Sequence, residues 1–600
     1  MSCLDDNYRR SFYEVHMNKY LAVISIILVI AGCKLMQSAQ TLPEGEPDNG
    51  GLYLPDGFVA SMVVDSVGST RHIAVNSNGD IYAKLRSSRP GQGGTIGMRD
   101  LNNDGKVDSI VRFGNYVDVG GSAVGVTIHN GYLYTSTVRQ VLRNKLKSGE
   151  LVPTSETEVV LTDMDPNVAR NWHTTKPLGF DKKGNMYVPF GSPSDAGQDL
   201  SKYGPIGIPN GKGLDPSPEL LKHGGIWKFD ANKLNQTQDD GVRYATGIRS
   251  VVGMTWNDAD DNLYAVMNGI DNFHTIYPDL FTPWQAAVLP SEPLLRVTEG
   301  SDFGWPYAYY DHMLQKNVLQ PGYGGNSTAT EGRAAKYNLP VMGFPGHWAP
   351  MDVMFYKGNQ FPARYKEGAF VALHGSTDRS PYPQAGYIVC FIPFNKDGSA
   401  QPWEVFADGF TVVDTVVNTS DAKYRPMGLA EGPDGSLYLS ESNKGKIWRV
   451  MYKGDKSKFN AANLAKMAQR KATRSYIKDP DPVNDNLNRG DELYGSILYK
   501  TYCASCHQGN GKGDDSRFPP LAGSDWVVGD KERLIRAILF GLEGEIKVNG
   551  QIWNGLMPAH ESFLSDHAVA SISTYIRQNF GNNASEITGA EIAKVRKAGK

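Results

Sequence analysis

Cysteine is scarce in this chain, which has 5 Cys among 600 residues. This scarcity excludes a small disulfide scaffold, because such proteins are dense in cysteine. Charge of one sign is also lacking: 61 Lys and Arg residues stand against 64 Asp and Glu residues, and the formal net charge is −3. A nearly neutral chain offers no electrostatic case for binding nucleic acid. The hydrophobic and charged fractions, 40% and 21%, are those of a globular protein.

Long hydrophobic runs are lacking too, and the apolar run at 21–31 is too short for a comfortable membrane span. It follows Lys19, and a basic segment before a short apolar run is typical of an export signal. Acidic residues among the first 16 do not suit such a signal, so we expect the true start to be Met17. Cys33 closes the sequence Ile-Ala-Gly-Cys, which resembles a bacterial lipobox; the alternative is an ordinary cysteine.

These features predict a signal and lipobox segment over 1–33, lipid on Cys33 and a polar tether over 34–50. Two or more acyl chains hold a protein stably on a bilayer. We therefore expect an exported bacterial protein in the periplasm or cell envelope, anchored to a membrane by its lipid.

Two of the cysteines belong to Cys503-Ala504-Ser505-Cys506-His507, the C-x-x-C-H pattern of covalent c-type haem attachment. Cys503 and Cys506 are predicted to bond the haem, and His507 to ligate its iron. Met557, between Gly and Pro residues downstream, is the candidate for the second axial ligand; the alternative is core packing. His/Met ligation suits electron transfer. The single motif predicts one haem.

The flanks of this motif predict helices over 491–502 and 564–580. Gly495 and Tyr499 precede the motif, and Tyr575 lies on the second helix. With these residues, 484–585 resembles the class I cytochrome c family, in which the first and last helices cross through a small residue and an aromatic. Residues 519–521 resemble the loop that supports the proximal His. The resemblance implies a small all-α domain, followed by a tail over 586–600.

A repeat fills the middle of the chain. An apolar strand, a turn with Gly, Asn or Asp, and a strand that ends in an aromatic recur six times, closing at Tyr82, Tyr134, Tyr187, Tyr264, Phe370 and Tyr438. The spacing is that of propeller blades with growing insertions. It predicts an all-β six-bladed propeller over 51–452, with a binding face made by loops near the axis. Tandem β-sandwiches are the alternative. Residues 453–483 are predicted to be the linker to the cytochrome domain.

Four stretches of this region carry a second resemblance: 172–178, 247–250, 267–272, and Arg379 together with 423–425. With them, 51–452 resembles the quinoprotein sugar dehydrogenases of the soluble glucose dehydrogenase and sorbosone dehydrogenase type. That family binds pyrroloquinoline quinone (PQQ) on a six-bladed propeller. The resemblance therefore implies PQQ and Ca²⁺ as cofactors and a sugar as substrate.

The resemblance implies a role for individual residues. His173 matches the catalytic base, since oxidation of an alcohol requires loss of its hydroxyl proton; the alternative is a structural His. Arg249 falls where the family places an Arg on the quinone oxygens. Backbone carbonyls of Gly269 and Ile270 are the matches for Ca²⁺ ligands. The basic residues implied to bind the PQQ carboxylates, with solvated charges as the alternative, are Arg379, Lys423 and Arg425.

The sequence also departs from the glucose-oxidising members. Ser192 follows Gly191 where those members have an Asp that orients the catalytic His, and Asp195 and Asp199 are the candidates to replace it. The Gln expected in the second repeat is absent from 120–122. These departures favour the sorbosone-type branch. Two tryptophans in family signatures could cover the cofactor or lie in the core: Trp305 and Trp348.

A separate segment, 100–108, matches the start of an EF-hand-like Ca²⁺ loop but lacks the distal Glu. It is open between a structural Ca²⁺ site and a plain Asx turn. The residues that would bind Ca²⁺ are Asp100, Asn102, Asp104 and Asp108.

Together, these patterns favour PQQ-dependent oxidation of a sugar or related hydroxy or aldehyde compound. Electrons would pass to the fused haem and on to a respiratory acceptor. Two alternatives stay open: a propeller that binds a carbohydrate or a partner protein, with the cytochrome as carrier, and a Ca²⁺-dependent lactonase-like hydrolase.

Overall fold

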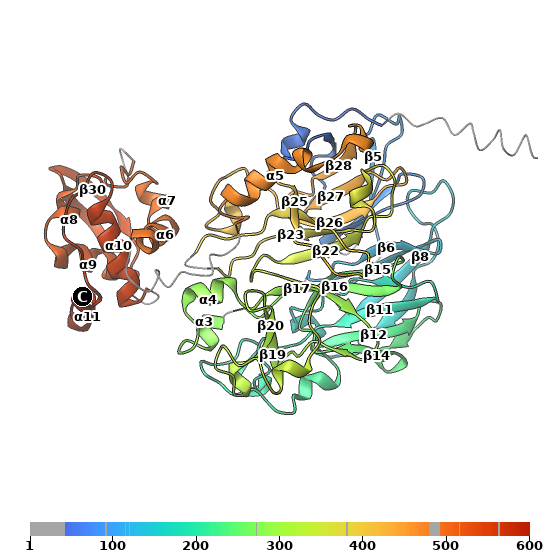
Figure 1. The fold of residues 1–600 in the computed structure, drawn as a ribbon, viewed down its shortest axis with the longest axis horizontal. Coiled ribbons are helices and arrows are strands. Elements are labelled where there is room, and N and C mark those ends of the chain that lie inside the picture. The colour runs from blue at the N-terminus through green and yellow to red at the C-terminus, as the bar shows by residue number, and fades with distance from the viewer. Residues whose placement is uncertain are drawn as a thin grey trace, which may run out of the picture. The chain divides into compact units, whose positions relative to one another are not determined.

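The computed structural model describes residues 42–89, 93–114, 116–118, 121–271, 273–379, 382–478, 492–514, 517–561 and 564–599 (Figure 1). The predicted signal and the lipid-bearing Cys33 lie outside these residues. Among the helices in these ranges, none is long and apolar enough to cross a membrane.

Each sequence repeat forms one sheet of consecutive antiparallel strands, and this confirms the predicted six-bladed all-β propeller. The first three sheets contain β2 (Thr70–Val75), β3 (Ile81–Arg89), β4 (Gly93–Arg99), β5 (Ser109–Phe113); β6 (Val126–His129), β7 (Tyr132–Ser136), β8 (Gln140–Lys145), β9 (Glu158–Thr162); and β10 (Gly179–Phe180), β11 (Asn185–Phe190), β12 (Gly225–Asp230), β14 (Val242–Thr246). The last three contain β15 (Val251–Asn257), β16 (Asn262–Met267), β17 (Glu292–Val297), β21 (Met342–Phe344); β22 (Pro350–Phe355), β23 (Ala369–Leu373), β24 (Ile388–Ile392), β25 (Glu404–Ala407); and β26 (Pro426–Glu431), β27 (Leu437–Glu441), β28 (Ile447–Tyr452).

The insertions between these strands add short elements. β13 (Gln236–Thr237) joins β9, and β18 (Ser301–Asp302) joins β14. The other inserted elements are the hairpin of β19 (Ala308–Asp311) and β20 (Lys316–Leu319) and the helices α2 (Leu200–Tyr203), α3 (Phe273–Ile276) and α4 (Pro283–Val288).

The ring is closed by its two ends. β1 (Phe58–Val64), the first strand of the domain, pairs antiparallel with β28, and Phe58 lies opposite Tyr452. The outer strand of the last blade is therefore supplied by the N-terminal segment. Backbone hydrogen bonds between residues about 400 positions apart hold the propeller together.

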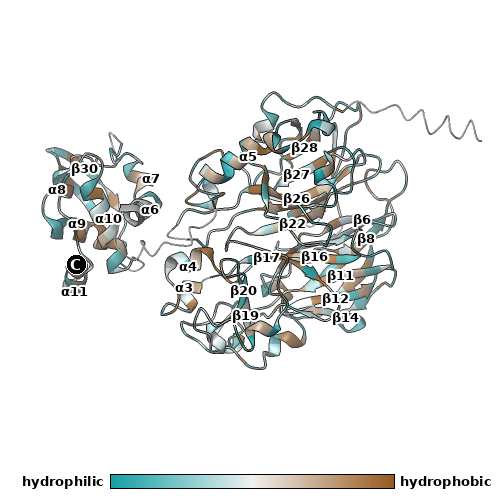
Figure 2. Ribbon diagram, in the orientation of Figure 1, coloured by the Kyte–Doolittle hydropathy of each residue, from teal (hydrophilic) through white to brown (hydrophobic). Residues whose placement is uncertain are grey.

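Glycine in the repeats lets the innermost strands approach one another around the axis. Contacts join β2 to β6 and β26, β15 to β10 and β22, and β22 to β26. A Cβ at Gly253 would lie 2.5 Å from the Cα of Asp352, and one at Gly428 would lie 2.8 Å from the carbonyl oxygen of Arg71. Such contacts leave no room for a larger residue. Hydrophobic residues concentrate in the sheets (Figure 2), and the largest buried side chains include Trp348 and Trp448.

Part of the predicted linker is ordered structure on the propeller. α5 (Ala461–Thr473) is capped by Asn460 and contacts β25. Met467, Tyr476 and Ile477 are buried in the same hydrophobic cluster as strands of the fifth blade. The segment from 453 to 478 therefore extends the propeller domain, and the remainder of the predicted linker lies largely outside the described residues.

The C-terminal domain contains both predicted helices. They are α6 (Glu492–Tyr502) and α10 (Asp566–Gln578). The domain also contains α7 (Ala504–His507), α8 (Asp525–Val528) and α9 (Lys531–Phe540) between them, and α11 (Gly589–Ala598) after α10. α6 crosses α10 at Gly495, where a Cβ would lie 2.3 Å from the Ser571 carbonyl oxygen. The prediction of an all-α domain missed one feature, a hairpin of β29 (Leu542–Val548) and β30 (Gln551–Met557).

Candidate functional site

Residues at the starts of the innermost strands meet at one end of the propeller. The amide of His72 donates to the Val124 carbonyl, and the amide of Val124 donates to the Thr175 carbonyl, so these blades are aligned at the same level. The hydroxyl of Thr175 donates to the carbonyl of Val251 in the next blade. Polar side chains that precede or begin these strands are therefore brought together around the axis.

His173 is held as a neutral imidazole with one free nitrogen. Its Nδ1 lies 2.6 Å from the carbonyl oxygen of Ser192. A carbonyl only accepts, so Nδ1 carries the hydrogen and Nε2 presents a lone pair. Burial and the neighbouring Arg249 guanidinium lower the pKa of His173 to about 3. A carbonyl of residue 192 thus orients the imidazole where the family uses the side chain of an Asp.

Asp195 and Asp199, the two candidates to replace that Asp, have different places. Asp199 caps the N-terminus of α2 by accepting from the amide of Ser201. Asp195 is buried, and its Oδ1 lies 4.0 Å from Nε2 of His173 and 2.5 Å from Nη2 of Arg249. Asp195 is therefore the carboxylate beside the candidate base, on the side of the free nitrogen.

Arg249 is almost fully buried and joins two carboxylates and one carbonyl. Its Nη2 donates to Asp195 and, at 2.9 Å, to Asp271, and its Nη1 donates to the carbonyl of Gly269. Burial disfavours the charge, but the two carboxylates outweigh it and raise the pKa of Arg249. A Ca²⁺ ion on the Gly269 carbonyl would compete with Arg249 for that oxygen. The side chain of Ile270 is buried.

Arg71, which the sequence analysis missed, belongs to a second basic group at the same end. Its Nη2 donates to the carbonyl of Gly121 at 3.0 Å, and its Nε is shielded from solvent without a hydrogen-bond partner. Burial, then repulsion from Arg86 and Arg425, lowers the pKa of Arg71 to about 10. The sequence gives no signal for Arg71, because an alignment of the repeats on Tyr82 and Tyr438 places it opposite Met427 and not opposite Arg425.

This basic group lacks counter-charge among its described neighbours. The carboxylate that acts on Arg71 is Asp118, which already pairs with the fully buried Lys84 at 2.8 Å. Arg425 donates to the carbonyls of His374 and Gly375. Buried guanidinium groups with free N–H donors and no paired acid fit a ligand with several carboxylates.

The other two predicted carboxylate-binding residues differ in position. Arg379 is buried, donates from Nε to the carbonyl of Ala287, and has a pKa that burial lowers to about 10. Arg425 lies 6.0 Å from the centre of the Tyr387 ring, and the charges of Arg425 and Arg379 both oppose the rise in the pKa of Tyr387 that burial causes, so both guanidinium groups lie near this side chain. Lys423 is exposed, and its Nζ lies 5.3 Å from the Tyr424 ring in a different cavity.

Two tryptophans and one lysine of the family-like stretches are structural. Trp305 and Trp348 are both buried, and the indole N–H of Trp305 donates to the carbonyl of Asp195. Trp305 thereby fixes the backbone of the carboxylate beside His173. Lys176 is fully buried and pairs with Asp163 at 2.7 Å.

The EF-hand-like loop is closed by its own side chains. Asp100 accepts from the amides of Asn103 and Gly105, and Asp108 accepts from the amide of Leu101. Asn102 accepts from the amide of Asp104. These bonds are those of an Asx turn. Binding of Ca²⁺ there stays a prediction.

The four predicted haem residues line one cavity of about 690 Å³ in the C-terminal domain: Cys503, Cys506, His507 and Met557. Nδ1 of His507 donates to the carbonyl of Pro519 at 2.9 Å, so Nε2 is left free to bind iron. Trp553 also lines this cavity, and its buried indole N–H has no partner. An apolar cavity with an unused donor fits a haem, whose propionates are acceptors.

Replacing Met557 by alanine is expected to remove the sixth iron ligand and lower the haem potential by tenths of a volt, because axial ligands set the potential. A redox titration followed in the visible spectrum measures the change. Ile552→Ala is the matched control, since Ile552 is 66% exposed on the same strand, β30, and does not line the cavity. An unchanged potential in Met557→Ala would show that Met557 is not the ligand.

His312 gives a prediction for acid stability. Burial lowers its pKa to about 4, below the ordinary value of about 6.5 in the unfolded chain. The unfolded state then binds more protons between these values, so the contribution of His312 is present above pH 6.5 and is lost as the pH falls toward 4. We expect the free energy of unfolding, measured by denaturant titration at pH 7, 6 and 5, to fall less steeply with decreasing pH for His312→Gln than for wild type. Equal slopes would contradict the prediction.

Comparison with known proteins separates the same two domains. The TrAA12-like family profile matches residues 52–453, and the profile of cytochrome C oxidase, cbb3-type, subunit III matches residues 490–576. Cytochrome c-552 of Thermus thermophilus is 36% identical over 111 residues, which are 17% of this chain and 83% of that protein. An uncharacterized protein of Borreliella burgdorferi is 28% identical over 211 residues, 35% of this chain, and the chain covers only 48% of its length.

Two solved structures share the propeller fold. The holo form of the pyranose dehydrogenase PQQ domain from Coprinopsis cinerea is 19% identical with a TM-score of 0.50, and the match covers 67% of this chain and 97% of that one. The calcium structure of the Trichoderma reesei carbohydrate-active enzyme of family AA12 is 18% identical with a TM-score of 0.52, over 67% and 97% of the two chains. At this identity the likeness concerns the fold.

Proposed function

The chain belongs to the TrAA12-like family through residues 52–453, and from that premise we propose that its propeller oxidises a sugar or related hydroxy or aldehyde compound with PQQ. The electrons then pass to the haem c of the C-terminal domain and on to a respiratory acceptor. Both profile matches support an oxidoreductase of the PQQ sugar dehydrogenase family joined to a cytochrome c domain.

The observation that carries the proposal is the uncompensated positive charge at the end of the innermost strands. Arg71 and Arg425 lie there with donors directed at carbonyls and at the Met427 sulfur, and the Nε of Arg71 has no acceptor among the described residues. PQQ carries three carboxylates, and Arg pairs with carboxylates in a bidentate geometry. Arg379 adds a buried cation near Tyr387.

Three side chains of the propeller would have separate roles at the reacting carbon: His173, Asp195 and Arg249. The lone pair of His173 Nε2 takes the hydroxyl proton of the substrate, and Asp195 stabilises the imidazolium that results. Arg249 supplies fixed positive charge for the negative charge that develops nearby. When bound, PQQ supplies the two-electron oxidising capacity, and Ca²⁺ on the carbonyls of Gly269 and Ile270 would polarise it as a Lewis acid.

The fused haem makes the acceptor part of the same molecule. Linking two modules raises the effective concentration of one at the other without new contacts. The sorbosone-type substrate, export to the periplasm or cell envelope, and a membrane anchor on Cys33 complete the proposal. They rest on the residues given in the sequence analysis.

Spectroscopy of the purified protein tests this function. Protein with its haem attached is reconstituted with PQQ and Ca²⁺, aldoses and sorbosone-like compounds are added, and reduction of the haem is followed at its α-band. We expect reduction that depends on both PQQ and substrate. If PQQ does not bind, or if the haem stays oxidised with every substrate, the binding-propeller alternative is favoured. Lactone hydrolysis without haem reduction would favour the hydrolase.

A further inference from the structure

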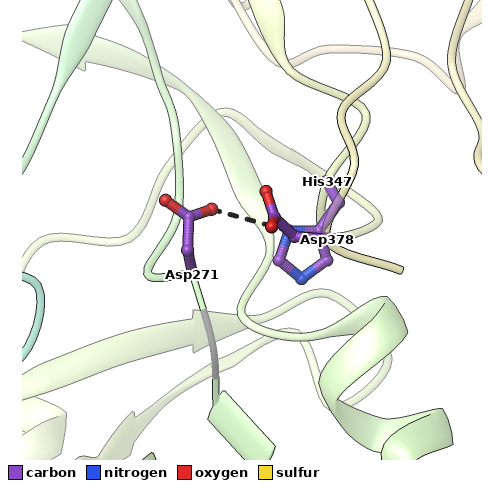
Figure 3. A group of neighbouring side chains, drawn as sticks. All are labelled: Asp271, His347 and Asp378. Carbon is purple, nitrogen blue, oxygen red and sulfur yellow. Dashed lines mark ion pairs between the residues drawn. The ribbon is translucent and has the colours of Figure 1, made fainter. Parts of the chain in front are cut away.

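Three metal-ligating side chains gather beside Arg249, and one of them, Asp271, also pairs with Arg249. They are Asp271 after β16, His347 before β22 and Asp378 after β23, and one ligand atom of each lies within 4.8 Å of the others (Figure 3). Figure 3 shows them on three separate segments. Because the segments come from different blades, the group is assembled by the propeller and is not a local turn motif.

His347 is the informative member. It is 3% exposed, and its Nε2 lies 2.8 Å from the carbonyl oxygen of Ala286. The carbonyl accepts, so Nε2 carries the hydrogen and the lone pair is on Nδ1. Metal-binding histidines nearly always donate their second N–H to a carbonyl or carboxylate in this way. The backbone of His347 also has a φ of +65°, an uncommon conformation that clusters at functional sites.

Nδ1 of His347 has no hydrogen-bond partner at hydrogen-bond distance. It faces Oδ1 of Asp271 at 3.7 Å, which is too long for a hydrogen bond. The position between the two atoms is taken either by a proton on Nδ1, which completes an ion pair with Asp271, or by a metal cation bound to both atoms.

The two carboxylates are arranged to complete a cation site. Asp271 gives Oδ2 to Arg249, which leaves Oδ1 toward His347. Asp378 is exposed and accepts from the Ser376 hydroxyl with one oxygen. Glu292 is 97% buried close to the group, and burial raises the pKa of its carboxyl to about 7. Donor atoms around a tetrahedral Zn²⁺ are about 3.4 Å apart, so the three atoms would have to approach by up to about 1.4 Å, and the exposed Asp378 is the side chain with room to move.

We infer that Asp271, His347 and Asp378 form a divalent-cation site with one nitrogen and two oxygen donors, which takes its metal in the absence of the quinone. Ca²⁺ favours oxygen ligands alone, whereas imidazole with carboxylates suits first-row transition ions. The site therefore selects Mn²⁺ or Zn²⁺ over Ca²⁺. It is distinct in its donors from a site made of the carbonyls of Gly269 and Ile270.

Metal binding is measured on the full-length, PQQ-free protein with its haem, after EDTA treatment and dialysis. Calorimetric titration with MnCl₂, ZnCl₂ and CaCl₂ is expected to show one saturable site that prefers Mn²⁺ or Zn²⁺. His347→Ala and Asp378→Asn should each weaken it by about tenfold or more. His274→Ala is the matched control, because it removes an exposed imidazole elsewhere. Asp378→Asn keeps the test valid if His347→Ala does not fold.

A spectroscopic arm identifies the nitrogen ligand. With the haem reduced to its diamagnetic ferrous state, spin-echo EPR of the Mn²⁺-loaded protein should show coupling to an imidazole nitrogen that His347→Ala loses. Three results would each overturn the inference: no one-to-one site in the wild type, metal affinities of both variants equal to that of the wild type, or a preference for Ca²⁺. Neither quinone nor substrate is present, so this result is independent of the proposed sugar oxidation.

Discussion

Replacing His173 by alanine is expected to lower substrate-dependent haem reduction by about 10²–10⁴-fold, the range for loss of a general base. The imidazole is oriented by the Ser192 carbonyl and presents its free Nε2 near Asp195. Alanine removes the neutral imidazole whose Nε2 lone pair is oriented to accept the hydroxyl proton as the hydride leaves. The initial rate at the haem α-band under saturating substrate measures the effect.

The haem and the quinone must be intact for that result to be informative. The oxidised and reduced spectra of His173→Ala should match those of wild type, and PQQ titrated by fluorescence quenching should bind with similar affinity. His274→Ala, in an exposed position on α3, should keep the wild-type rate. A loss of less than tenfold in His173→Ala, with PQQ bound, would remove His173 from the role of base.

The fold was predictable because the propeller repeats its signals. The alternation of strand, turn and aromatic recurs in each blade, and the glycines of the inner strands mark the close approach at Gly253 and Gly428. The C-x-x-C-H motif places the haem residues by sequence adjacency alone. The hairpin β29–β30 was missed since its β29 alternates exposed and half-buried residues and has little apolar signal.

The electrostatics of the site were less predictable, because they depend on contacts between blades. Asp195 and not Asp199 lies beside His173, because Asp199 caps α2 whereas Asp195 pairs with the Arg249 guanidinium. Single positions of the sequence do not show that Arg71 lacks a paired acid, since Asp118 is engaged by Lys84 from another strand. The linker was predicted to begin at residue 453, but Tyr476 and Ile477 are buried in a hydrophobic cluster of the propeller.

Replacing Arg71 by methionine is expected to move two measurements in opposite directions. Affinity for PQQ should fall by roughly 30-fold or more, because losing one partner of a buried charged contact costs about 2–5 kcal/mol and each 1.4 kcal/mol is tenfold. Quinone-free Arg71→Met should instead be more stable than wild type by on the order of 1 kcal/mol. The substitution removes repulsion from Arg86 and Arg425 and the unpaired Nε.

The opposition of the two effects separates a ligand-binding role from a structural one. Replacing a residue that supports the fold lowers the stability of the protein. A cation that serves an anionic ligand instead destabilises the ligand-free protein, and binding of the ligand offsets this cost. Arg112→Met is the control, since Arg112 is exposed and donates to the carbonyl of Val67; it should leave PQQ affinity unchanged. If Arg71→Met lowered stability and left the quinone affinity intact, the basic group would be part of the scaffold and the anionic cofactor would have to be held elsewhere.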